Sequence, residues 1–232
     1  NRRFASRLQY GVSYTWSKSL DYNSDDANPV SNIIPVRVSN YGLSTFDRTH
    51  VLKINWLYDL PGLTQGHRVL RWLTNGWQTS CIYTASSGAP SAVSFSTVNA
   101  VDITGSPTEA ARIVLTGEPS LSRGERTFGR WFDTSKAAIP AVGTIGNAAR
   151  TNIRLPGINN WDLTAYKNFN VKERFAAQLR AEFYNAFNHT QYSGVDATAR
   201  FDAQGRQVNA TFGQVNAART ARRIQLAIRL TF

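Results

Sequence analysis

The sequence lacks several features that mark common functional classes. It contains one cysteine, Cys81, and no methionine among 232 residues. A single thiol can form neither an internal disulfide nor a cysteine-based zinc site. No stretch approaches the roughly eighteen consecutive apolar residues of a transmembrane helix, which excludes that class. The first residues contain no initiator methionine and no signal-peptide pattern, so we expect the chain to be a mature or excised piece of a longer protein.

Charge is also scarce, although its balance is strongly basic. Charged residues make up 18% of the chain, hydrophobic residues 42% and aromatic residues 12%, with a net charge of +11. This composition is too apolar for a disordered chain. The basic residues are scattered, and no RNA-binding signature or basic helical stripe occurs. We therefore expect no nucleic-acid partner.

The strongest pattern is a two-residue alternation of apolar and polar side chains, which predicts β-strands. It recurs in six segments. Their apolar positions are Leu8, Tyr10, Val12, Tyr14 and Trp16; Leu52, Ile54, Trp56, Tyr58 and Leu60; Trp77, Cys81, Tyr83 and Ala85; Trp161, Leu163, Ala165, Phe169 and Val171; Phe175, Ala177, Leu179, Ala181, Phe183 and Phe187; and Ile224, Leu226, Ile228, Leu230 and Phe232. Residues 173–187 are rich in good helix formers, so a helix remains the alternative there.

The connections between these segments alternate between long and short. Long loops are expected near residues 21–45, 88–160 and 189–218, and shorter turns near 61–75 and 170–174. Such long loops are uncommon in compact soluble domains. They are typical of the outer side of outer-membrane barrels, whose periplasmic turns are short.

Aromatic side chains gather near the ends of the predicted strands. Those near the long loops are Trp16, Phe46, Trp161 and Phe187, and those near the short turns are Trp56, Tyr58, Trp77, Phe169, Phe175 and Phe232. Two aromatic girdles around an aliphatic band are typical of a barrel wall in contact with lipid. A soluble core with aromatics at its rims is the alternative.

The opposite strand face carries charges that a dry core would tolerate poorly. We predict that it lines a water-filled lumen. The lumen-facing candidates are Arg7, Asp47, Lys53, Gln178, Arg180, Glu182, Tyr184 and Arg229. Six strands are too few to close a barrel, and an open sheet in lipid leaves two unsatisfied edges. The predicted fold is therefore all-β, an antiparallel meander of about six long transmembrane strands across residues 1–232 that forms part of a large outer-membrane β-barrel.

A set of short motifs occurs in order along nearly the whole chain. They are Ser13-Tyr-Thr-Trp-Ser-Lys-Ser19, Asp47-Arg-Thr-His50, Gly76-Trp-Gln78, Ser87-Gly-Ala-Pro90, Trp131-Phe-Asp-Thr134, Gly143-Thr-Ile-Gly-Asn147, Asn160-Trp-Asp-Leu163 and Phe183-Tyr-Asn-Ala-Phe-Asn-His-Thr190. Together they resemble the C-terminal barrel segment of TonB-dependent outer-membrane receptors, in the Oar-like group that carries a carboxypeptidase-regulatory-like N-terminal domain. The resemblance implies a large plugged barrel in the outer membrane of a Gram-negative bacterium. It also implies uptake of an unidentified ligand, driven by the TonB system through a plug that this sequence lacks.

Two features of the last segment suggest further partners. The alternating residues Ile224, Leu226, Ile228, Leu230 and Phe232 resemble the terminal signal read by the barrel assembly machinery, and an exposed strand edge suits recognition by strand addition. Arg219, Arg222 and Arg223 form the one tight basic group and are expected at the level of lipopolysaccharide phosphates. A solvated rim is the equally open alternative for these arginines.

Residue patterns for catalysis or metal binding are missing. His50, His67 and His189 lie far apart, no carboxylate stands at ligand spacing, and no nucleophile elbow or phosphate-binding loop occurs. We therefore expect no enzyme activity, no cofactor and no metal. A secreted β-sandwich adhesin and an outer-membrane hydrolase are kept as alternative functions.

Overall fold

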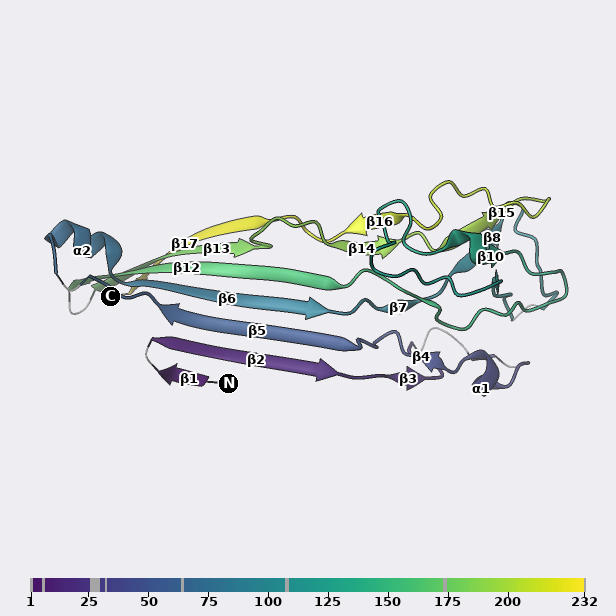
Figure 1. The fold of residues 1–232 in the computed structure, drawn as a ribbon, viewed down its shortest axis with the longest axis horizontal. Coiled ribbons are helices and arrows are strands. Elements are labelled where there is room, and N and C mark those ends of the chain that lie inside the picture. Colours follow the sequence, from purple (N-terminus) through teal and green to yellow (C-terminus); the bar gives the residue numbers. More distant parts are fainter. Residues whose placement is uncertain are drawn as a thin grey trace.

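One antiparallel sheet dominates the computed structural model, which describes residues 2–5, 7–25, 30–31, 33–63, 65–106, 109–172 and 175–231. Its seven strands follow the order β1-β2-β5-β6-β12-β13-β17 (Figure 1). The strands are β1 (Arg2–Ala5), β2 (Leu8–Trp16), β5 (His50–Asp59), β6 (Trp77–Ser86), β12 (Ile158–Lys172), β13 (Phe175–Tyr184) and β17 (Arg223–Thr231). Each pairs with its sequence neighbours in this sheet, so the predicted meander of six long strands is confirmed, with the short β1 added at one edge.

Residues 175–184 form a strand, so the helix alternative for this segment is wrong. Each residue of β13 from Ala177 to Phe183 pairs with both β12 and β17, and a helix could not satisfy these two ladders. Among the described residues, no helix is long and apolar enough to cross a lipid bilayer.

Strand register carries the sequence alternation across the whole sheet. Ile54 pairs with Val12 on β2 and with Tyr83 on β6, while the adjacent Lys53 pairs with Ser13 and Thr84. Directly paired residues of antiparallel strands lie on the same face. One face of the sheet is therefore apolar and the other polar.

No second layer of the described chain covers the apolar face. Val12 on β2 keeps 52% of its surface exposed, and Leu226 and Ile228 on β17 keep 76% and 69%. In a β-sandwich these side chains would interdigitate with a second sheet. The structure therefore argues against the soluble-sandwich alternative, at least for the residues it describes.

The three long connections gather at one end of the sheet and fold together (right side of Figure 1). They contain the strand pairs β3 (Leu20–Asp21) with β4 (Gly42–Leu43), β7 (Pro90–Ser91) with β11 (Ile153–Arg154), β9 (Val114–Leu115) with β10 (Ala137–Ala138), and β14 (Tyr192–Val195) with β16 (Val215–Ala218). They also contain α1 (Val36–Ser39) and the 3-10 turn η1 (Thr134–Lys136). We call this region the outer layer.

The outer layer has the hydrophobic core of the described chain. Its buried members are Val93, Ile113, Phe132, Ala148, Ile153, Ala199, Phe201 and Phe212. Parallel pairing of β8 (Ser94–Thr97) with β15 (Thr198–Phe201) joins the second connection to the third. Segments expected only as long loops are thus packed against one another.

The opposite end of the sheet has shorter connections. The link between β5 and β6, expected as a turn, contains the helix α2 (Arg68–Thr74), at the left of Figure 1. The link between β12 and β13 contains residues 173–174, which lie outside the described residues.

Candidate functional site on the polar face and its outer junction

A chain of polar contacts runs along β13 on the polar face. The Tyr184 hydroxyl donates to Glu182 Oε2 at 2.8 Å, and Glu182 forms an ion pair with Arg180. The Arg180 guanidinium lies 5.1 Å from the centre of the Tyr166 ring on β12. The structure thus brings three of the lumen-facing candidates together on one strand.

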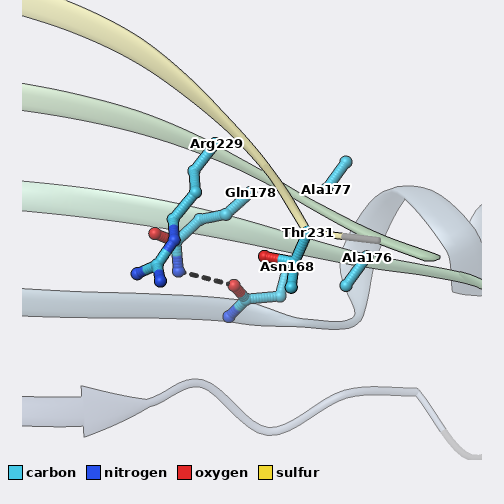
Figure 2. A pocket seen from close by; sticks show the side chains of 6 residues that line it. All are labelled: Asn168, Ala176, Ala177, Gln178, Arg229 and Thr231. Carbon is cyan, nitrogen blue, oxygen red and sulfur yellow. Dashed lines mark hydrogen bonds between the residues drawn. The ribbon is translucent and has the colours of Figure 1, made fainter. Parts of the chain in front are cut away.

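Two further candidates meet beside the short-turn end of the sheet. Gln178 pairs with Arg229 across β13 and β17, and Gln178 Nε2 donates to Asn168 Oδ1 at 2.8 Å. These three side chains line a shallow cavity of about 200 Å³, and Figure 2 shows Ala177 pointing the other way. The sequence alternation placed Asn168 on this face but did not single it out as part of a site.

The remaining candidates on this face are separate from that group. Lys53 is exposed in the middle of β5. Arg7 lies outside the strands, in the tight link between β1 and β2, where its φ of 70° is left-handed and its carbonyl accepts from the Asp59 amide at 2.9 Å.

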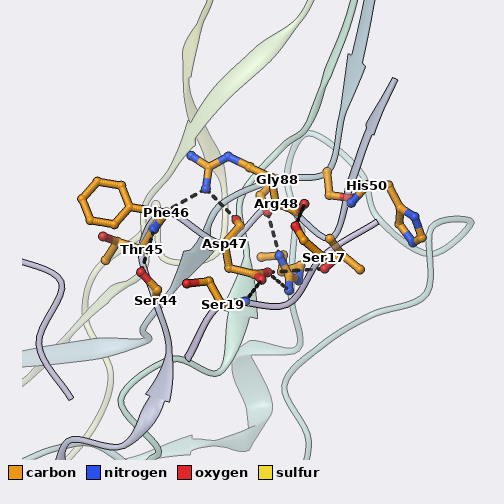
Figure 3. A network of polar contacts seen from close by, with 12 residues as sticks. Ser17, Ser19, Ser44, Thr45, Phe46, Asp47, Arg48, His50 and Gly88 are labelled. Atoms are coloured by element: carbon orange, nitrogen blue, oxygen red, sulfur yellow. Dashed lines mark hydrogen bonds and ion pairs between the residues drawn. The ribbon is translucent and has the colours of Figure 1, made fainter. Parts of the chain in front are cut away.

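Asp47 differs from the other candidates because it is only 1% exposed. Asp47 lies in the turn that precedes β5, which begins at His50. The Asp47 amide donates to Ser44 O at 2.9 Å. Its carboxylate accepts from Ser19 N at 2.8 Å and from the Arg154 guanidinium at 2.6 Å, a network that Figure 3 shows in part. Asp47 was expected to be a water-exposed lumen residue, but it is buried. It instead joins the outer layer to the sheet through its hydrogen bonds.

The electrostatics of Asp47 follow from these contacts. Burial by itself raises the pKa of the Asp47 carboxyl, but the hydrogen bonds from Ser19 and Arg154 outweigh that effect and hold the pKa below its ordinary value. Arg154 also donates to the Gly88 carbonyl at 3.0 Å. One guanidinium thus joins three segments: the turn before β5, the start of the second connection, and β11.

A second ion pair joins the first two connections. Arg150 pairs with Asp21 on β3 and donates to Ser24 Oγ at 2.6 Å and to Asn40 O at 3.2 Å. Burial raises the pKa of Asp21, but its hydrogen bonds with Ser24, Ser44 and Arg150 lower it by more.

Next to this pair the outer layer contains a cavity of about 260 Å³. It lies between the α1 segment and residues 109–112 and 145–148. Arg112 lies in the wall of this cavity and donates to Ser39 Oγ at 3.3 Å. Burial lowers the pKa of Arg112. Glu109 also lines this cavity, so the recess contains both a cationic and an anionic side chain and suits a polar ligand.

The last strand forms where the alternation predicted it, and the basic cluster lies at its start. Arg219 and Arg222 are exposed in the segment before β17, and Arg223 begins that strand. The Arg219 amide donates to Gln191 O, and the Arg222 amide donates to Asn188 Oδ1. Arg223 pairs with Tyr184 at the outer end of β13. Ile224, Leu226, Ile228 and Leu230 are exposed on the apolar face of β17, an edge strand of the described sheet. Phe232 lies outside the described residues.

Lys167 was missed by the sequence analysis. It lies on the apolar face of β12, yet it is only 4% exposed, and its ammonium group donates to the Trp72 and Asn75 carbonyls at the end of α2. A lysine within an otherwise apolar alternation was the available signal. In the part of the chain that the structure describes, no group of three or more His, Cys, Asp or Glu side chains could hold a metal ion.

Comparison with known proteins identifies the family. A family model described as an outer membrane beta barrel domain matches residues 1–225. The chain belongs to the outer membrane β-barrel domain family. No curated protein and no solved structure matches it significantly.

Membership of this family indicates which environment the sheet occupies. Outer-membrane barrels present an apolar band to lipid, a polar face to the interior and short turns to the periplasm. The chain therefore belongs in the outer membrane of a Gram-negative bacterium. In such a barrel we expect the uncovered apolar face to meet lipid and the polar contacts along β13 to face the interior.

Proposed function

We propose that the chain is part of the barrel wall of a TonB-dependent receptor of the Oar-like group, which takes up a ligand across the outer membrane. The observation that carries this proposal is the charged and hydrogen-bonded face that runs along β12, β13 and β17. Placing such a face beside water costs little free energy, whereas burying it in a dry interior costs much more. It suits the wall of a hydrated transport path.

The outer layer supports the receptor part of the proposal. The second and third connections share one core, and a recess between the first and second connections has Arg112 in its wall. Preorganised loops bind with a smaller loss of conformational entropy than flexible ones. In this proposal the outer layer captures the ligand, the polar face lines its route, and the protein has no catalytic role.

Partners follow from the same proposal. The TonB system would act through a plug domain, and the barrel assembly machinery would recognise the edge of β17. Arg219, Arg222 and Arg223 would contact lipopolysaccharide phosphates, since guanidinium groups bind phosphate in a bidentate manner.

Growth on scarce nutrients tests the transport function. Strains that lack the intact protein, TonB, or both would be compared across an array of nutrients at limiting concentration. We expect every nutrient that requires the protein to require TonB as well, and the double deletion to equal the TonB deletion. A nutrient whose uptake needs the protein but not TonB would contradict the proposal.

Labelling of introduced cysteines tests the polar face separately. In outer membranes, Lys53→Cys and Gln178→Cys should react with a membrane-impermeant thiol reagent, whereas the matched Leu52→Cys and Leu179→Cys should not. Native Cys81, 1% exposed, provides a low background. Equal labelling of both sets would remove the assignment of the two faces.

A further inference from the structure

The helix α2 is amphipathic and lies on the apolar side of the sheet. Successive helical residues are about 100° apart, so Val69, Leu70, Trp72 and Leu73 occupy one side while Arg68 and Arg71 occupy the other. The four apolar side chains are 49–60% exposed. Apart from the contact between the Trp72 and Phe169 rings, this side of the helix is largely uncovered in the described chain.

Several contacts fix α2 against the lipid-facing side. The Trp72 ring lies 5.1 Å from that of Phe169 on β12, and Trp77 Nε1 donates to the Leu73 carbonyl at 2.8 Å. Lys167 donates to the Trp72 and Asn75 carbonyls, where a cation also complements the negative end of the helix dipole. The helix is therefore held beside the apolar band, at the end of the barrel with short turns.

Arg68 and Arg71 have no ion-pair partner among the described residues. Both line a recess of about 320 Å³, together with Trp72, Asn75 and Phe169. The recess thus combines two free guanidinium groups with two aromatic rings. A phosphate group attached to an acyl chain satisfies both parts.

We propose that α2 and this recess form a binding site for an anionic phospholipid of the periplasmic leaflet. Arg68 and Arg71 contact the lipid phosphate, while the acyl chains lie along Trp72 and Phe169. Continuity with the apolar band favours a lipid over a soluble periplasmic protein, because the uncovered side of α2 extends the surface that already meets the bilayer. The inference rests on the outer-membrane location and is independent of the transport proposal.

Lipid retention by the intact purified protein tests the site. After delipidation, the protein would be titrated with phosphatidylglycerol or phosphatidylcholine, and bound lipid counted by native mass spectrometry. Each basic residue near an anionic surface contributes about 1 kcal/mol, so R68Q/R71Q should weaken phosphatidylglycerol binding roughly tenfold or more. Binding of phosphatidylcholine should weaken less, because its choline cation already neutralises the phosphate that the arginines contact. The control R123Q/R200Q removes the same charge from exposed positions of the outer layer and should leave both affinities unchanged.

A third variant tests the apolar half of the site. Trp72→Ser should reduce retention of both lipids, because it removes the ring along which the acyl chains lie without changing charge. The proposal is overturned if R68Q/R71Q binds phosphatidylglycerol like the wild type, as it would if α2 served a periplasmic protein. It is also overturned if the control loses as much affinity, or if inorganic phosphate displaces phosphatidylglycerol at equal concentration.

Discussion

Replacement of Arg154 by glutamine tests the junction between the outer layer and the barrel wall. Asp47 is 1% exposed and Arg154 is its cationic partner at 2.6 Å, so Arg154→Gln leaves a buried carboxylate without its counter-charge. Breaking a buried ion pair in this way costs about 3–5 kcal/mol. The lower figure applies here because the Arg154 side chain retains 29% exposure. The population of outer-layer conformations open to protease should then rise about a hundredfold.

Protease digestion of intact cells measures this population. Cleavage follows the open fraction when opening and closing are fast relative to cutting. We expect the second connection, residues 87–157, to be cut about a hundred times faster in Arg154→Gln. The double variant Asp47→Asn with Arg154→Gln should regain most of the resistance, because it removes the uncompensated charge.

The same junction predicts a pH dependence. The pKa of folded Asp47 lies below its ordinary value, so its ionised form contributes stability above about pH 4. That contribution is lost as pH falls through the lower folded pKa. The difference between wild type and Arg154→Gln should therefore shrink on acidification, because a protonated Asp47 needs no cation. Equal cleavage of the two proteins at neutral pH, or a double variant as sensitive as the single one, would refute this reasoning.

Three further substitutions test other parts of the structure. Phe132→Ala removes a 1% exposed ring that packs edge-on against Phe212 at 5.3 Å. It should destabilise the outer layer by about 3–5 kcal/mol, which the same cleavage assay measures. The barrel should keep its heat-resistant electrophoretic mobility. Gly88→Ala places a Cβ 1.6 Å from the Leu155 carbonyl and should cost about 2 kcal/mol or more, whereas Gly124→Ala, in open space, should not increase cleavage. Lys167→Met removes two charge-assisted hydrogen bonds, worth about 1.5 kcal/mol or more in total, and should speed hydrogen exchange of residues 66–76 about tenfold with no change at β13. Unchanged exchange there would mean that Lys167 does not hold α2.

The sheet could be predicted from the sequence because the two-residue alternation depends only on the local geometry of a strand. Strict alternation at residues such as Leu179 and Arg180 is set by the strand geometry itself, and it predicts which side chains share a face without knowledge of the partner strand. The same local signal fails where a strand ends. Asp47 was expected on the polar strand face together with Lys53, but it belongs to a turn that is held by Ser44 and Arg154.

The outer-layer core could not be predicted in this way. Its residues Ile113, Phe132 and Phe201 come from irregular segments far apart in the chain, where no periodicity marks a buried position. Trp56 shows a related limit. It was expected at the short-turn end, but its ring lies edge-on to Trp161 of β12, 6.3 Å away. The strand β6 lies between them, and the residue of β6 that pairs with Trp56 is the small Cys81, so the two large rings meet across that strand.

The division between sheet and outer layer bears on how a ligand could pass. The sheet gives one face to lipid and the other to water, so it is held mainly by its continuous backbone ladders and has little side-chain core. The outer layer has a core, and the β8 and β15 pair binds two of its connections into one body. Arg154 fixes that body to the turn before β5 and to Gly88, while Arg150 fixes it to the first connection. Independent movement of a single loop would break a buried ion pair or open this core. In the proposed transport function, the packed connections should therefore keep their shape, and the ligand should pass beside them along the polar face.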